Sequence, residues 1–202
     1  MANPKEVTQE PKVVNGVNVD ELFKTVDAVK TNPLVAKFRF RLGNEWIDGG
    51  HNRSTVNEFQ GAGQDLQRPQ AFTLEADEPP ILLGSDKAPN PVEYLLTALA
   101  ACVTTSMVYH AAARGIRVEE IESQVEGDID LRGFLGIDKN VRNGFQNIRM
   151  NCRIHADISD EQLQELAQLG PTFSPVFDSV TKGVPVSVQA QRMGAKQASG
   201  AA

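Results

Sequence analysis

The sequence predicts an α+β fold, because segments typical of strands and of helices come in blocks. The expected order along the 202 residues is three strands, one long helix, two strands, two helices and a last strand. Such blocks favour α+β over a doubly wound parallel sheet, in which single strands and helices alternate. The long helix has the clearest boundaries of these segments, and the other elements flank it in the sequence.

Start and stop signals bound this helix within the stretch NPVEYLLTALAACVTTSMVYHAAARG, from Asn90 to Gly115. Asn90 is a good N-cap, Pro91 suits the first turn, and Glu93 stands where a capping-box carboxylate reaches back to the cap. Gly115 is a typical C-terminal stop. The signals at both ends therefore predict one uninterrupted helix.

The helix carries no formally charged side chain from Tyr94 to Ala113. At about 1.5 Å per residue it is about 36 Å long, which is enough to cross a bilayer. Its many alanines, its threonines and the lack of interfacial tryptophan favour a core helix of a soluble protein instead. We therefore expect no membrane partner.

The part of the chain before this helix is predicted to form a tail, a short helix and an antiparallel sheet. Residues 1–15 are polar and are expected to be flexible. The next segment, NVDELFKTVDAVKTNP, has apolar residues at helical spacing and ends before Pro33. Three strands are predicted, in LVAKFRFRL, EWIDGGHNRSTVNEF and AFTLEAD, with a hairpin turn at Gly43-Asn44 between the first two.

Two more strands are predicted after the long helix. The first lies in IRVEEIESQVEGDIDLRG, and the second, in FQNIRMNCRIHADI, alternates apolar and polar residues. Such alternation places one set of side chains on a core face. That set comprises Ile148, Met150, Cys152, Ile154, Ala156 and Ile158. Residues 132–144 are expected to form the loop between these strands.

The C-terminal part is predicted to contain two helices and a strand. Ser159 and Gln162 form a capping box for a helix through Leu169, which Gly170-Pro171 should stop. Ser174-Pro175 suits the start of a second helix, and VPVSVQAQ is the last predicted strand.

Composition and net charge indicate which partners and which cell compartment to expect. The net charge is −6 and the isoelectric point about 5.1, so no basic face is expected for nucleic acid or anionic lipid. The start of the chain lacks the apolar core of a signal peptide, and two cysteines are too few for a secreted disulfide scaffold. We therefore expect a cytoplasmic protein.

Cys102 lies in the middle of the long helix and is the candidate for chemistry. At about 100° per residue, its side of the helix also carries Leu95, Leu99, Ser106 and Tyr109, whereas Glu93 falls on the opposite side. A second copy of the helix, in a dimer, would bring a glutamate and a cysteine together.

A buried cysteine is usually an inert apolar residue, so reactivity requires a nearby cation that favours the thiolate. Three arginines of the predicted N-terminal sheet are candidates: Arg39, Arg41 and Arg53.

These residues resemble the OsmC/Ohr family of osmotically inducible and organic-hydroperoxide-resistance proteins. The resemblance covers roughly residues 35–190. It rests on four stretches, of which the Pro-x-Glu…Ala-Ala-Cys helix is the most specific: GGHNRSTV, FTLEADEPPILLG, PNPVEYLLTALAACVTTSMVYHAAARGI and SPVFDSVTKGVPVSV.

The resemblance implies an OsmC-like domain over residues 16–192, with antiparallel sheets wrapped around the long central helices of an intertwined homodimer. Residues 193–202 would form a flexible C-terminal tail. It also implies a cysteine-based, thiol-dependent peroxidase that reduces organic hydroperoxides in stress defence, without a metal or organic cofactor. The expected partners are a second copy, the hydroperoxide and a thiol reductant.

By the same resemblance, Cys102 corresponds to the attacking cysteine. Arg53 is chosen as the arginine that stabilises its thiolate, and Glu93 as the glutamate that orients that arginine or the substrate. Apolar neighbours would favour fatty or aromatic peroxides over hydrogen peroxide, because only these bury apolar surface. The expected substrate contacts are Leu95, Leu99, Phe173 and Phe177.

The sequence departs from the family at Ser174-Pro175, where the family has Cys-Pro with the resolving thiol. Attack of Cys102 on a peroxide would then leave a sulfenic acid for an external thiol to reduce, in a one-cysteine cycle. Cys152 does not match the resolving position, and its inward place on a strand favours a packing role.

Other classes of function are weighed on the same residues. His51, His110, His155 and Cys102 have no metal-ligand spacing, and no paired histidine and acid beside Cys102 supports a hydrolase. The main alternative is a binding module or redox sensor for a small apolar molecule, with little or no peroxidase turnover.

Overall fold

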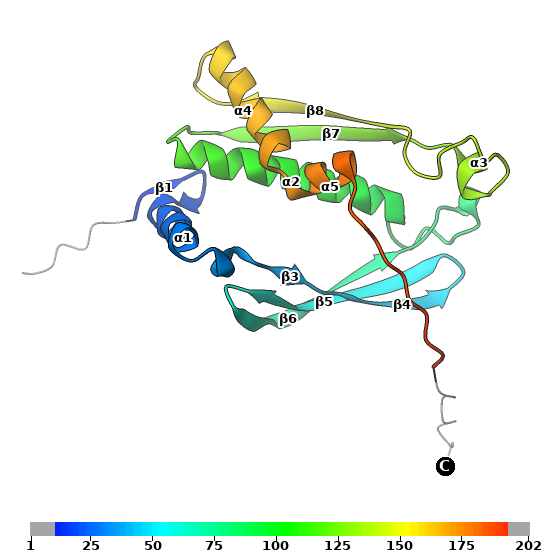
Figure 1. Cartoon of the computed structure of the whole chain (residues 1–202). Coiled ribbons are helices and arrows are strands. Elements are labelled where there is room, and N and C mark those ends of the chain that lie inside the picture. Colours follow the sequence, from blue (N-terminus) through cyan, green and yellow to red (C-terminus); the bar gives the residue numbers. More distant parts are fainter. Residues whose placement is uncertain (1–10, 194–202) are drawn as a thin grey trace, which may run out of the picture.

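The computed structural model describes residues 11–193 and has an α+β fold with one long central helix. This helix, α2 (Pro91–Ala113), lies along a two-stranded antiparallel sheet of β7 (Glu120–Asp128) and β8 (Asn147–His155). A second antiparallel sheet lies on the other side of the molecule (Figure 1). The predicted fold class is therefore confirmed.

A small N-terminal hairpin precedes the first helix. Its strands are β1 (Val13–Val14) and β2 (Val17–Asn18), joined by a turn in which Asn15 and Gly16 have positive φ. Asn18 then caps α1 (Val19–Thr31), the predicted short helix. Of the predicted tail at 1–15, residues 1–10 lie outside the described part, as do residues 194–202 at the other end.

The second sheet is built around β5 (His51–Gly61). Its neighbours are β6 (Gln64–Ala76) on one side and, end to end on the other, β4 (Gly43–Asp48) and β3 (Arg39–Phe40). The predicted strand at LVAKFRFRL is thus mostly not strand, since a 3₁₀ turn, η1 (Pro33–Ala36), follows the helix-ending proline.

The predicted turn at Gly43-Asn44 is wrong. Both residues pair with β5, because β3 and β4 share one neighbour and do not pair with each other. The turn lies instead at Gly49-Gly50, where Gly49 has a φ of 52°.

The predicted boundaries of α2 are confirmed. The Asn90 side chain accepts a hydrogen bond from the Glu93 amide at 2.9 Å, and the Glu93 carboxylate accepts one from the Asn90 amide at 2.8 Å. Gly115 follows the helix with positive φ. By length and composition α2 could cross a membrane, and no other helix among the described residues could.

One stripe of α2 forms the core of this half of the molecule. Leu99, Val103, Met107 and Ala111 are buried there together with Leu166. The predicted inward residues of β8, among them Met150, pack against this stripe. The loop predicted at 132–144 begins with a short helix, α3 (Leu131–Phe134).

Two further helices pack on the same core stripe, α4 (Asp160–Phe173) and α5 (Pro175–Lys182). The predicted capping box at Ser159 and Gln162 is present. The predicted stop at Gly170-Pro171 is wrong, because α4 continues to Phe173. Gly170 packs against α2 and accepts a hydrogen bond from the Ser174 amide at 3.0 Å, which closes the last turn.

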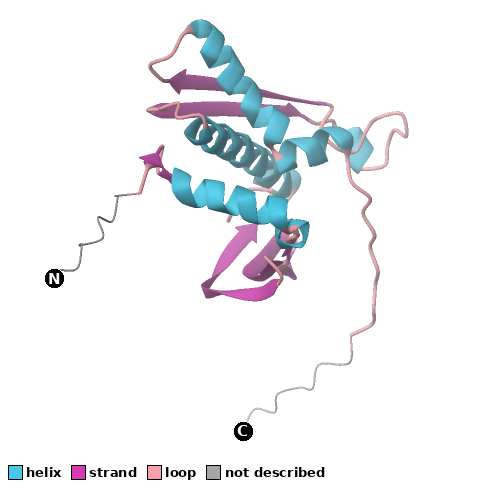
Figure 2. Ribbon diagram, turned by 60° about the vertical axis from the view of Figure 1, so that its left-hand side comes forward, coloured by secondary structure: helices cyan, strands magenta, loops and turns pink. Residues whose placement is uncertain are grey.

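The last predicted strand, VPVSVQAQ, is absent from the sheets of the described chain. The segment runs extended and away from both sheets in Figure 2. Val186 is 81% exposed and Val188 91% exposed. The alternating pattern is that of a strand, but this chain offers it no paired neighbour.

The close contact between α4 and α2 at Gly170 leads us to predict the effect of a substitution there on stability. A Cβ there would lie 2.7 Å from Cγ1 of Val103. Glycine to alanine in a helix normally gains about 1 kcal/mol. Here we expect Gly170→Ala to lower the free energy of unfolding by about 1–2 kcal/mol, because the overpacking outweighs that gain. Urea denaturation measures this, with Thr172→Ala on the exposed side of α4 as control. A stabilised Gly170→Ala protein would contradict the packing.

Candidate functional site

Cys102 lies at the edge of the buried stripe of α2. It is half-buried, and its neighbour Val103 is fully part of the core. Of the residues predicted on its side of the helix, Leu95 and Tyr109 are 39% and 48% exposed, whereas Leu99 is buried in the core. Ser106 donates a hydrogen bond to the Cys102 carbonyl oxygen at 2.8 Å. The thiol thus lies between the core and an apolar side of α2 that the described residues leave partly exposed.

Glu93 and Arg53 each have a partner other than Cys102. The Glu93 carboxylate closes the capping box at the start of α2. Arg53, on β5, donates from Nε to Oε1 of Glu75 on β6 at 2.8 Å. Among the described residues, no hydrogen bond or ion pair joins Cys102, Arg53 and Glu93 to one another.

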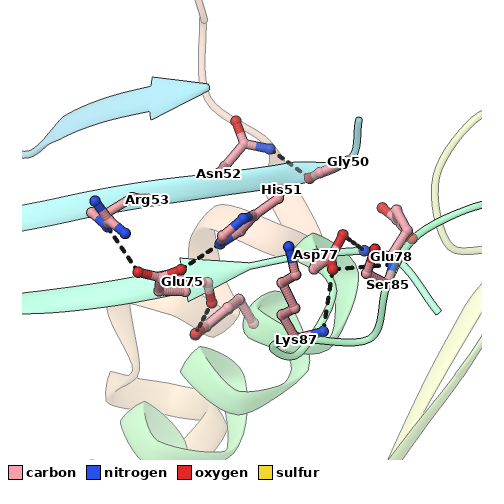
Figure 3. A network of polar contacts seen from close by, with 10 residues as sticks. Gly50, His51, Asn52, Arg53, Glu75, Asp77, Glu78, Ser85 and Lys87 are labelled. Carbon is pink, nitrogen blue, oxygen red and sulfur yellow. Dashed lines mark hydrogen bonds and ion pairs between the residues drawn. The ribbon is translucent and has the colours of Figure 1, made fainter. Parts of the chain in front are cut away.

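Glu75 is the centre of a polar network that the sequence analysis missed (Figure 3). Its second carboxylate oxygen contacts Nε2 of the buried His51, and its backbone oxygen accepts a hydrogen bond from the Tyr94 hydroxyl at 2.6 Å. The hydrogen bond from Arg53, reinforced by that from His51, holds the pKa of Glu75 below its ordinary value. Glu75 is therefore a carboxylate at neutral pH and fixes Arg53 from one side.

The fork of Arg53 remains partly open. Its Nε donates to Glu75, and no acceptor among the described residues takes a hydrogen bond from its two terminal nitrogens. A guanidinium has five N–H donors in a fixed plane, so a residue held at Nε presents the remaining donors in a defined direction. The hydrogen bond to Glu75 raises the pKa of Arg53 further, so its charge is permanent.

Asp77 organises the loop that leads into α2. The carboxylate is buried and accepts hydrogen bonds from the amides of Glu78 at 2.8 Å and of Ser85 and Lys87 at 3.2 Å each (Figure 3). This loop contains the 3₁₀ turn η2 (Pro80–Leu82) and ends at the N-cap of α2. Burial raises the pKa of Asp77, but these three amides, with the nearby His51, outweigh it and bring the net pKa below its ordinary value.

The expected substrate contacts are divided between different places. Leu99 and Phe177 line one cavity of about 460 Å³, together with Cys152. Phe173 stacks on His110 with ring centroids 3.8 Å apart, and Leu95 lies exposed on the side of Cys102. The structure therefore brings together only two of the four.

The remaining predicted positions have structural explanations. Ser174 is buried and caps α5, where its hydroxyl accepts a hydrogen bond from the Phe177 amide at 3.1 Å. Cys152 packs beneath the core stripe, and both cysteines are free thiols. Burial raises the pKa of Cys152. Over residues 11–193, no three histidine, cysteine or acidic side chains gather as a metal site would require.

A family model described as OsmC-like protein matches residues 84–189, more than half of the chain. The chain belongs to the OsmC-like family. Its members include organic hydroperoxide resistance peroxidases. The predicted resemblance is therefore confirmed. The matched segment of this OsmC-like protein starts just before α2 and contains Glu93, Cys102 and Ser174.

Solved structures of the family share the fold of this OsmC-like protein at low sequence identity. An OsmC-like protein from Mycoplasma pneumoniae is 18% identical, with a TM-score of 0.54 over 72% of this chain and 89% of its own. A Psychrobacter arcticus protein assigned to osmotic stress and the detoxification response is 13% identical, with a TM-score of 0.53 over 70% and 88%.

An organic hydroperoxide resistance protein OsmC from Legionella pneumophila is 14% identical, with a TM-score of 0.48 over 71% of this chain and 91% of its own. No curated protein matches the chain in sequence. At these identities the likeness to the Mycoplasma and Psychrobacter structures shows the fold, and the activity must be argued from the residues.

From the hydrogen bonds of Asp77 we predict a contribution to stability that depends on pH. A carboxylate whose folded pKa is lowered stabilises the fold above its unfolded pKa of about 3.9 and loses that contribution as pH falls through the folded pKa. We expect Asp77→Asn to lower the melting temperature at pH 7, because an amide group replaces an acceptor of backbone hydrogen bonds. The difference from the parent should shrink below about pH 4.

Thermal unfolding between pH 3 and pH 8 measures this difference. Asp86→Asn, an exposed aspartate in the same loop, is the matched control and should have the parent melting temperature throughout. Equal melting temperatures for Asp77→Asn and the parent at pH 7 would show that the carboxylate does not hold the loop.

Proposed function

We propose that this OsmC-like protein is a thiol-dependent peroxidase that reduces organic hydroperoxides, with Cys102 as its nucleophile. The observation that carries the proposal is the position of Cys102, half-buried at mid-helix on an apolar side of α2. Such surroundings favour a substrate with an apolar body over hydrogen peroxide. Membership of a family that includes organic hydroperoxide resistance peroxidases supports the same activity.

The chemistry balances with one cysteine and an external thiol. The Cys102 thiolate attacks the outer oxygen of ROOH, so that an S–O bond forms, the O–O bond breaks, and RO⁻ takes up a proton to leave as ROH. A thiol then displaces water from the sulfenic acid and forms a mixed disulfide, and a second thiol releases Cys102 with an external disulfide. Ser174 has no thiol, so the external reductant completes each cycle.

Arg53 is the proposed source of positive charge for the thiolate and for the departing oxygen. Its two terminal guanidinium nitrogens have no acceptor among the described residues and can donate hydrogen bonds to a ligand, while Glu75 holds the group at Nε. Glu93 is proposed to orient Arg53 or the substrate while it also closes the capping box. Leu95, Leu99, Phe173 and Phe177 are proposed to contact the organic part of the peroxide.

A homodimer is proposed to complete the site, because the single chain leaves large apolar surfaces uncovered. Tyr109 on α2 is half exposed, Trp46 on β4 is 69% exposed, and Phe72 on β6 is 60% exposed. Exposed large apolar side chains on several elements favour an interaction with a second copy, because burying them removes apolar surface from water. The unpaired segment at residues 184–191 is a further candidate for pairing with a second copy.

The alternative function is a binding module or redox sensor without turnover. One observation favours this alternative function: Cys102 is not among the residues that line the cavity formed by Leu99 and Phe177. The acidic balance of the chain supports a small-molecule substrate rather than nucleic acid, and the proposed location is the cytoplasm.

The peroxidase proposal predicts the behaviour of two cysteine variants. With cumene hydroperoxide and dithiothreitol, the parent should turn over, and Cys102→Ser should lose activity by orders of magnitude because the nucleophile is gone. Cys152→Ser should keep the parent rate. Peroxide consumption gives the rate, and intact mass of the oxidised protein should show one added oxygen on Cys102. Full activity in Cys102→Ser would end the proposal, and a slow parent would favour the binding module.

The same assay tests the arginine. Arg53→Gln should slow both turnover and alkylation of Cys102 by iodoacetamide, because less of the thiol is ionised. Glu75→Gln should have an intermediate effect. Glu45→Gln is the matched control, since Glu45 pairs with Arg53 across the strands from β4 without a hydrogen bond to it. An equal effect of Glu45→Gln and Glu75→Gln would show that Glu75 does not orient Arg53.

The dimer predicts a mass in solution. Sedimentation equilibrium should give twice the 22.0 kDa of the chain. Tyr109→Glu places a charge on the uncovered side of α2 and should shift the protein to the single-chain mass, because burying an unpaired charge is costly. Tyr109→Phe keeps the apolar area and should remain a dimer. A parent protein at 22.0 kDa would contradict the dimer.

A further inference from the structure

A cavity of about 460 Å³ lies between β8, α4, α5 and the core stripe of α2. Aliphatic and aromatic side chains supply most of its wall. Examples from each element are Leu99 of α2, Met150 of β8, Ala167 of α4 and Phe177 of α5. The volume falls within the range of small-molecule sites, which are mostly apolar with a few polar groups.

The cavity is separate from the candidate site. Cys102, Arg53 and Glu93 do not line it. It shares Leu99 and Phe177 with the proposed peroxide contacts, but its only thiol is that of Cys152. An occupant therefore needs no peroxide group to fit, and the inference does not depend on the proposed peroxidase activity.

The polar groups of the cavity are all uncharged at neutral pH. Gln164 and Gln168 are exposed, lie one turn apart on α4 and mark the mouth, and Thr181 of α5 is a third polar side chain. Deeper in the wall, the Cys152 thiol faces the core side of β8. Because burial raises its pKa, Cys152 contributes a neutral thiol and not an anion.

Charge and size restrict the occupant. No charged side chain lines the cavity, so an ionic group at its mouth would lose part of its hydration and gain no ion-pair partner. An apolar wall also holds water poorly. At about 30 Å³ per water molecule in the liquid, the volume has room for about fifteen non-hydrogen atoms.

We propose that this cavity binds an uncharged, mainly aliphatic molecule of medium chain length, with its single polar group at the mouth formed by Gln164 and Gln168. The glutamine amides both donate and accept hydrogen bonds, so a hydroxyl or carbonyl group satisfies them. The chain of the ligand lies along the inward residues of β8, against Met150 and Cys152.

The test uses the full-length Cys102→Ser protein, so that peroxide chemistry cannot contribute. The fluorescence of uncharged N-phenyl-1-naphthylamine reports binding. We expect 1-decanol to displace the probe, and decanoate, which has the same chain with a carboxylate, to do so at least about tenfold more weakly at pH 8. Equal competition by the two would overturn the proposed selection for uncharged ligands.

Two variants place the probe in this cavity. Ala167→Leu adds an isopropyl group inside the wall and should weaken probe binding by at least about tenfold. Ala28→Leu makes the same change on the exposed side of α1, away from the cavity, and should bind like the parent. If both variants bind the probe equally, the probe lies elsewhere and the proposal fails.

Cys152 gives an independent readout of the same site. Because its thiol lines the cavity, 1-decanol should slow its alkylation by N-ethylmaleimide in Cys102→Ser, and decanoate should do so less. Unchanged alkylation under saturating 1-decanol would overturn the proposal. So would failure of the probe to bind at all, as expected if residues 184–191 of a second copy fill the cavity. None of these results depends on whether the parent reduces peroxides.

Discussion

The structure depends on the need to cover a long helix, α2, that has no charged side chain from Tyr94 to Ala113 and is too apolar to be fully exposed to water. Helix α2 buries one stripe, from Leu99 to Ala111, against β7, β8, α4 and α5. Gly170 lets α4 approach this stripe closely enough to touch Val103. The side that carries Cys102 has less cover among the described residues, where Leu95 and Tyr109 are exposed. The same helix therefore serves as the core of one half of the molecule and also presents apolar side chains at its surface.

The arrangement around Arg53 shows how electrostatics and fold are linked. Glu75 and His51 lie on neighbouring strands, and Tyr94 ties the backbone of Glu75 to the first turn of α2. The arginine is thereby coupled to the helix of Cys102 through rigid elements rather than through a direct contact. Asp77, two residues further along the chain, fixes the loop that sets where that helix starts. The charge of Arg53 on the sheet is in this way held in place relative to the helix that carries the Cys102 thiol.

Local features of the fold could be predicted from sequence, because they depend on residues three or four positions apart. The caps of α2 and α4 and the side of α2 that Cys102 shares with Tyr109 are of this kind. Features set by distant partners could not. Gly43-Asn44 has the composition of a turn, but its pairing with β5 decides its conformation. The segment at residues 184–191 has the pattern of a strand, and a strand requires a neighbour.

The candidate site follows the same division. The position of Cys102 follows from the spacing within α2, and the family resemblance was carried by the residues around it. The partner of Arg53 was missed, because Glu75 is opposite Arg53 only through the register of β5 and β6. The cavity beside Cys152 was missed too, since its walls come from four elements, of which α2 is distant in sequence from β8, α4 and α5, and their packing cannot be read from local spacing. The placement of residues on one element was therefore predictable, and contacts between elements were not.

Asn15 has a consequence for the order of events during synthesis. The side-chain nitrogen Nδ2 of Asn15 donates a hydrogen bond to the carbonyl oxygen of Ile116 at 3.0 Å, and its side-chain oxygen Oδ1 accepts one from the backbone amide of Val118 at 2.9 Å. Both partners are made about a hundred residues later. At about 5–20 residues per second, the N-terminal hairpin waits for several seconds or longer before its docking site exists. The hairpin is therefore made before α2 but fastened after it, and it closes over the turn after α2 only when that helix is complete.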